Sequence, residues 1–184
     1  MKNFIFATLA VFLTTGAFAQ NVQWGAKTGL NAAFEINSDD GSTDARPGLY
    51  VGVFSDINLG RKLSLQPELV YSMQGAKYEG YTDKLDYINL PIMLKIYVLK
   101  RELSVDVGPQ FGYMVNAKIK HGGSTIDIID DIDNKFDVAL GFGVSYTLLE
   151  RFDFGFRCNI GTIEIINNSD LYNMVFQFGV GYRF

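Results

Sequence analysis

The last twelve residues of the chain, NMVFQFGVGYRF, alternate strictly between two kinds of side chain. The members of one face are large and apolar: Met174, Phe176, Phe178, Val180, Tyr182 and Phe184. The other face holds Val175 together with glycine and polar residues. Alternation with a period of two is the pattern of a β-strand with one apolar face. We therefore expect a strand here, and its place at the end of the chain favours the closing strand of a membrane β-barrel.

Seven earlier segments alternate in the same way, over residues 22–34, 47–57, 63–74, 87–98, 103–116, 136–147 and 152–161. Each is long enough to cross a bilayer as a tilted strand, which takes about 9–11 residues. Long polar loops, such as 78–86 and 118–135, alternate with tight turns along the chain. This arrangement is typical of outer-membrane barrels. The predicted fold class is all-β, an eight-stranded antiparallel up-and-down transmembrane barrel with both termini on the short-turn, periplasmic side.

A soluble lipocalin-type barrel is the alternative, because alternation alone does not say which face meets water. The polar faces are rich in glycine: Gly25, Gly29, Gly52, Gly108, Gly112, Gly141, Gly143, Gly155, Gly161, Gly179 and Gly181. Glycine only weakens a strand that faces water, whereas inside a narrow barrel it leaves room for rings such as Tyr50 and Phe54. The apolar faces carry no charge. We therefore predict a polar interior and a lipid-facing exterior.

The first residues are those of a cleaved secretory signal. Lys2 precedes a short apolar run, and residues 17–19 form an Ala-x-Ala cleavage site. We expect residues 1–19 to be the signal peptide and residues 20–184 to be one barrel domain. The net charge of −4 argues against nucleic acid as a partner. Cys158 is the only cysteine, and we interpret it as a small lipid-facing hydrophobe.

Three segments carry a resemblance to a known family: residues 87–95 (YINLPIMLK), 108–118 (GPQFGYMVNAK) and 175–184 (VFQFGVGYRF). They resemble the small "porin family" outer-membrane β-barrel proteins of Gram-negative bacteria, within the PorT-like superfamily. The resemblance implies an eight-stranded barrel in the outer membrane. It also implies that Phe184 is the terminal aromatic residue that the barrel-assembly machinery reads. It carries no catalytic residues.

The most informative polar pattern is a set of charges on the inward faces: Lys27, Asp56, Glu68, Lys95, Asp106, Asp137, Asp153, Arg157 and Arg183. Glu68, Lys95 and Asp106 fall on three consecutive strands and are therefore neighbours. Buried charges are tolerable only when they are paired. Because an eight-stranded barrel is just wide enough for side chains, we predict a salt-bridge network that fills the lower lumen. An ion-selective constriction is the alternative.

The loops hold the remaining candidates. Residues 127–134 are rich in aspartate, but their spacing matches no calcium-loop motif, so we predict a solvated acidic loop. His121 and Ser124 would serve an enzyme only with a third group that the sequence does not mark. We predict no catalytic, cofactor or metal site. The expected partners are outer-membrane lipid, lipopolysaccharide, the assembly machinery and an extracellular ligand. The expected role is structural or interactive, with a small-solute channel second and a lipid-modifying enzyme a distant third.

Overall fold

The computed structural model describes residues 22–37, 41–42, 44–78, 80–121, 124–132, 135–162 and 171–184. The predicted signal peptide, residues 1–19, lies outside these ranges. No helix within them is long and apolar enough to cross a membrane.

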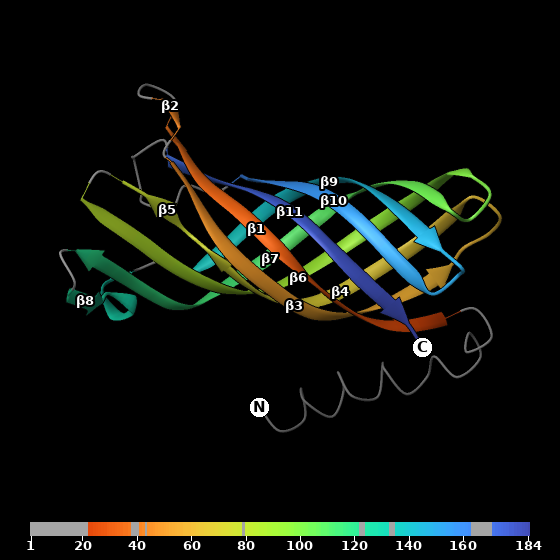
Figure 1. The fold of residues 1–184 in the computed structure, drawn as a ribbon, viewed down its shortest axis with the longest axis horizontal. Helices are drawn as coiled ribbons and strands as arrows, with labels where there is room; N and C mark the ends of the chain where they lie inside the picture. The colour runs from red at the N-terminus through yellow and green to blue at the C-terminus, as the bar shows by residue number, and fades with distance from the viewer. Residues whose placement is uncertain are drawn as a thin grey trace.

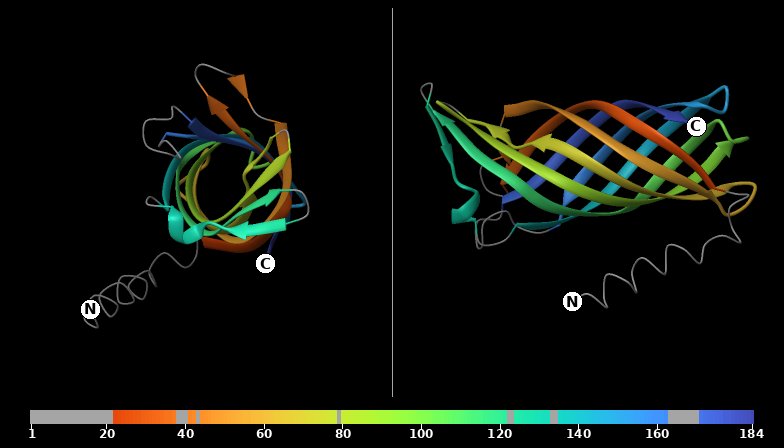
Figure 2. Two further views of the ribbon diagram at one scale, coloured as in Figure 1. Left: turned by 90° about the vertical axis from the view of Figure 1, so that its left-hand side faces the viewer. Right: turned by 90° about the horizontal axis from the view of Figure 1, so that it is seen from below.

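Eight long strands form one closed antiparallel barrel (Figure 1). They are β1 (Val22–Asn37), β3 (Asp44–Asn58), β4 (Leu63–Gln74), β6 (Tyr81–Leu99), β7 (Leu103–His121), β9 (Phe136–Leu148), β10 (Phe152–Gly161) and β11 (Leu171–Arg183). Each pairs with the next along the chain, and β1 pairs with β11 to close the ring. Seen from its loop end, the barrel is a closed ring of strongly tilted strands (Figure 2). The predicted all-β, eight-stranded antiparallel up-and-down barrel is confirmed.

The closing strand pairs with β1 over its whole length, from Gly25 opposite Arg183 to Asn37 opposite Leu171. The backbone N–H of Phe184 donates to the carbonyl oxygen of Trp24 at 2.9 Å, which fixes the end of the chain beside the start of β1. Both ends of the barrel domain lie beside the tight turns. Closure satisfies every strand edge of the ring, which a sheet crossing lipid requires.

The two faces of the wall differ as the alternation predicts. Apolar side chains such as Leu30, Phe154 and Phe178 stand exposed on the outside, whereas Tyr50 and Phe54 are buried inside the barrel. Seven outward aromatic residues lie near the strand ends: Trp24, Tyr146, Phe152 and Tyr182 on the turn side, and Tyr71, Tyr113 and Phe136 on the loop side. We interpret them as interfacial girdles that bound the spanning part of the wall.

The loop side departs from the sequence prediction. Residues 78–86 were expected to be a loop, but β6 begins at Tyr81, and β7 continues to His121. Beyond the membrane neither face of a strand has to be apolar, so the alternation that reveals a strand fades there. The expected loop at 118–135 is likewise wrong in part, because β8 (Ser124–Asp127) pairs with β7 before the 3-10 turn η3 (Ile129–Asp131).

Two short strands complete this end, β2 (Gly41–Ser42) on β1 and β5 (Ala76–Lys77) between β3 and β6. After β8 the chain folds back, and Ile128, Ile129 and Ile132 pack against a buried cluster of β6 and β7 side chains. That cluster consists of Leu85, Tyr87, Met114 and Ala117. The loop-side ends of β6 and β7 project beyond the other long strands (Figure 1). They and the segment after β8 form a small apolar core of their own.

Candidate functional site: the barrel lumen

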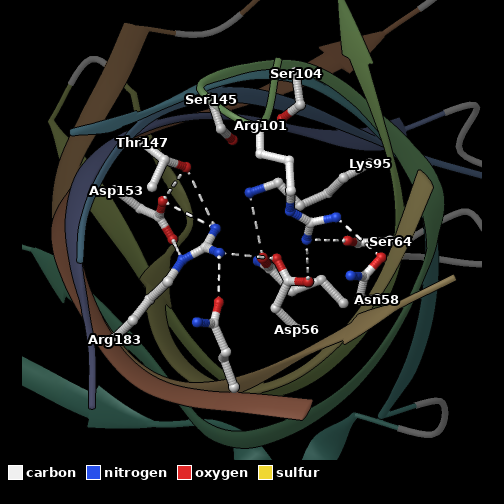
Figure 3. A network of polar contacts seen from close by, with 12 residues as sticks. Asp56, Asn58, Ser64, Lys95, Arg101, Ser104, Ser145, Thr147, Asp153 and Arg183 are labelled. Atoms are coloured by element: carbon white, nitrogen blue, oxygen red, sulfur yellow. Dashed lines mark hydrogen bonds and ion pairs between the residues drawn. The ribbon is translucent and has the colours of Figure 1, made fainter. Parts of the chain in front are cut away.

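Polar side chains project into the lumen at successive depths. Nearest the turns lies a group that we call the turn-side cluster: Asp56, Arg101, Asp153 and Arg183 (Figure 3). Nη1 of Arg183 lies 3.2 Å from Oδ2 of Asp56, and its Nε donates to Oδ2 of Asp153 at 2.8 Å. The Tyr97 hydroxyl donates to Asp56 at 3.2 Å. The Arg101 guanidinium reaches in from the β6–β7 turn, 3.6 Å from Asp56.

Halfway along the barrel, Glu68 on β4 is the acceptor for three side chains. Arg157 on β10 donates to both of its oxygens, at 2.7 and 3.0 Å. Lys27 on β1 donates at 2.9 Å, and Gln66 donates at 2.7 Å. The Glu68 side chain has no exposed surface. Bidentate, charge-assisted hydrogen bonds of this kind are roughly twice as strong as neutral ones.

Glu68 and Arg157 come from opposite sides of the barrel. The strands follow one another as β1, β3, β4, β6, β7, β9, β10 and β11. By this order β4 and β10 are four strands apart in either direction, on opposite walls. The Glu68–Arg157 ion pair therefore crosses the lumen from one wall to the other.

Lys95 and Asp106 lie opposite each other on β6 and β7 at the same depth, and both are buried. They do not join Glu68 directly. Among the described residues, the hydrogen-bond acceptor of the Lys95 ammonium is Oε1 of Gln66, at 3.3 Å. Asp106 accepts from the hydroxyls of Ser104, at 2.7 Å, and Ser145. We call Lys27, Glu68, Lys95, Asp106 and Arg157 the central cluster.

The ninth candidate of the sequence analysis, Asp137, lies apart from both clusters. A Cβ atom built on Gly112 would lie 3.4 Å from the Asp137 Cβ and 3.5 Å from the Tyr87 ring. Asp137 thus faces the lumen near its loop end, half-buried. Phe184, the predicted assembly signal, is 78% exposed at the opposite rim.

Sequence reasoning missed a chain of uncharged side chains above the central cluster. Asn159 donates to Gln177, Gln177 donates to Asn31, and Asn31 donates to Ser72, with distances of 2.9–3.0 Å. From the other side Asn173 donates to Gln74, which donates to Ser72. We call these six residues the amide chain. Their alternation places them on the inward faces of the strands, but the sequence prediction considered only the charged residues there.

Near the loop end of β1, Glu35 follows Phe34, whose ring faces outward. We place the end of the membrane-spanning part of β1 at Phe34. The Tyr78 hydroxyl donates to the Glu35 carboxylate, and the Tyr78 ring stacks on Tyr81 at 4.5 Å. Burial raises the pKa of Glu35 to about 7. The Tyr78 hydrogen bond acts in the opposite direction, whereas the nearby Asp83 carboxylate raises the pKa further. This carboxyl therefore titrates near neutral pH.

The structure brings together few of the loop candidates. His121 and Ser124 lie opposite each other at the exposed tip of the β7–β8 hairpin. Asp127 accepts the backbone N–H of Ile129, and Asp133 and Asn134 lie outside the described residues. Within the described ranges, no group of three or more His, Cys, Asp or Glu residues is placed to hold a metal ion. Cys158 is free and half-buried, at outward parity between Phe142 and Phe176.

With this geometry in view, comparison with known proteins gives the family. The outer membrane protein beta-barrel domain family matches residues 18–167. The chain belongs to this family. It is therefore an outer-membrane β-barrel protein, as its apolar exterior and closed ring require. No curated protein sequence matches the chain.

Solved structures agree on the fold. Neisserial surface protein A (NspA) is similar with a TM-score of 0.62 and 17% identity, over 88% of this chain and 97% of that one. Ail, the attachment invasion locus protein of Yersinia pestis, is similar with a TM-score of 0.58 and 12% identity, over 89% and 99% of the two chains. A structure of Ail with the heparin analogue sucrose octasulfate gives a TM-score of 0.56. At these identities the likeness concerns the fold alone.

Proposed function

We propose that this protein is a non-conducting, non-catalytic outer-membrane barrel that acts through its extracellular end and its contacts with lipid. The ion pair between Glu68 and Arg157 carries the proposal, because it joins opposite walls and so crosses the path that a solute would take. The turn-side cluster and the amide chain fill the lumen on either side of it. Both termini would lie in the periplasm, beside the short turns.

A liposome-swelling assay with small neutral solutes tests the closed lumen. Vesicles that contain the wild-type protein should swell no faster than protein-free vesicles. The double variant Arg157→Ala/Tyr50→Ala serves as the positive control, because it removes two large side chains from the middle of the lumen. Rapid swelling with the wild-type protein would favour the alternative function, a small-solute channel.

The outer surface supports a second part of the proposal, contact with lipopolysaccharide. Above the loop-side girdle, Lys84 on β6 lies directly opposite Lys118 on β7, and Lys120 is paired with Thr82 two positions further out. Like charges directly opposite each other destabilise a sheet. Asp127 on β8 lies opposite Lys118 on its other side and offsets one of these charges. An anionic partner such as a lipid phosphate would offset the remaining positive charge.

Lipopolysaccharide added to the protein in neutral lipid should therefore raise its unfolding temperature. The rise should shrink in the variant Lys84→Gln/Lys118→Gln. It should persist in Lys62→Gln, which removes an exposed lysine from the turn end. An equal rise in all three proteins would contradict a lysine-mediated contact, leaving the apolar exterior as the lipid-binding feature. An extracellular ligand would bind the same projecting loop-side ends of β6 and β7.

A further inference from the structure

A small cavity lies inside the lumen at the depth of the central cluster. Its volume is about 40 Å³, and the polar side chains around it include Lys27, Lys95, Arg157, Gln66, Asp106 and Ser145. A water molecule needs about 10–15 Å³ of such space. The cavity could therefore hold two or three waters or one monatomic anion.

The packing of the wall leaves this space open. At Gly179 an added methyl group would overlap the Tyr50 ring, so that glycine is already covered by a side chain. At Gly155, by contrast, a methyl group would meet only Ser145 Oγ at 3.6 Å and the Val144 carbonyl oxygen at 3.9 Å. Gly155 thus forms an uncovered part of the cavity wall.

Asp153 also lines the cavity, but it is paired with Arg183 in the turn-side cluster, where two arginines balance two aspartates. The charges of the central cluster itself do not balance. The central cluster contains three cations, Lys27, Lys95 and Arg157, but only two carboxylates, Glu68 and Asp106. Glu68 already accepts hydrogen bonds from Lys27 and Arg157. The cluster therefore carries one excess positive charge among buried side chains.

Lys95 is the cation with the fewest partners. It is 1% exposed, and an ammonium has three N–H donors. The described residues offer it one acceptor, a neutral amide oxygen at the long distance of 3.3 Å. Asp106, its neighbour across the strands, has each carboxylate oxygen bonded to a serine hydroxyl instead. A buried charge left with such weak compensation is costly.

We propose that this cavity binds a small inorganic anion of halide size, with the Lys95 ammonium as its principal donor. Such an ion would neutralise the excess charge of the central cluster and fill the space beside Gly155. The cavity is too small for an organic anion. The proposal does not depend on whether the lumen conducts, since a bound ion can be structural.

Bromide is the probe. Crystals of the purified full barrel grown with bromide in place of chloride should show one anomalous peak inside the lumen, in contact with Lys95 Nζ. In solution, the ³⁵Cl relaxation rate should show a saturable contribution from the protein that bromide displaces. Absence of a lumen peak, or a relaxation effect that does not saturate, would overturn the proposal in favour of a water-filled cavity.

Lysine variants inside and outside the lumen distinguish halide binding in the cavity from nonspecific halide binding to the protein. Lys95→Met should abolish the peak and the saturable relaxation effect, whereas Lys84→Met, which removes a lysine from the outer surface, should leave both unchanged. Asp106→Asn removes a repulsive charge beside the cavity and should tighten halide binding by on the order of tenfold. If Lys95→Met does not fold, Asp106→Asn still decides, because unchanged or weaker binding would overturn the proposal.

Discussion

Replacing Glu68 by glutamine would leave the shape of the central cluster almost intact but remove its shared negative charge. Arg157 and Lys27 would then lose their common ionic partner, which now accepts from them at 2.7–3.0 Å with no exposed surface. Breaking a buried ion pair by removing one partner costs about 3–5 kcal/mol. We expect Glu68→Gln to lower the free energy of unfolding by about this amount.

Equilibrium unfolding by urea in lipid vesicles measures this loss, with the fluorescence of Trp24, the only tryptophan, as the signal. Trp24 lies on the lipid-facing surface, 57% exposed, so its environment changes when the barrel leaves the bilayer. Glu150→Gln, at an exposed turn, is the matched control and should change the free energy by less than about 0.5 kcal/mol.

A double variant sharpens the test. If Glu68 and Arg157 act as a pair, removing both charges should cost clearly less than the sum of the two single changes. A loss below about 1 kcal/mol for Glu68→Gln, close to the value for an exposed ion pair, would refute the reasoning. It would mean that water reaches the central cluster and screens its charges.

Three further changes have distinct expected results. The carboxyl of Glu35 has a pKa of about 7 in the folded protein and an ordinary value of 4.5, so the free energy of unfolding should fall as the pH rises from about 4.5 to about 7. Glu35→Gln should flatten this pH dependence in urea titrations at several pH values. An unchanged pH dependence in the variant would contradict the assignment to Glu35. Gly179→Ala should destabilise the barrel by about 1–3 kcal/mol because the methyl group displaces the Tyr50 ring, whereas Gly155→Ala should cost much less in the same assay. Deleting Phe184 should reduce the amount of heat-modifiable barrel in outer-membrane fractions while export continues, and undiminished assembly would argue against its role as a signal.

The lipid-spanning wall could be predicted from the sequence because lipid imposes a single rule on every spanning strand. Outward positions must be apolar, so the parity of Phe178 or Leu30 follows directly from alternation. The same rule assigned all nine charged candidates to the inside. It fails at Tyr81 and His121, where the strands leave the membrane and neither face is required to be apolar.

The partners within the lumen could not be predicted in the same way. Adjacency along the chain suggested Glu68 with Lys95 and Asp106, but a barrel this narrow also brings opposite walls into contact. The ionic partners of Glu68 are therefore Arg157 and Lys27, whose side chains reach it across the interior. Such pairing depends on strand tilt and register, which alternation does not encode. The amide chain escaped notice because asparagine and glutamine carry no charge.

The central claim, that side chains close the lumen, is tested most directly by single-channel recording in planar bilayers. The purified wild-type barrel, inserted in a defined orientation and number, should leave the current at the baseline of the bare membrane across a range of voltages. A steady, voltage-independent open-channel current from the wild-type protein would contradict the claim. It would show that the ion pair of Glu68 and Arg157 does not block the path between the two ends of the barrel.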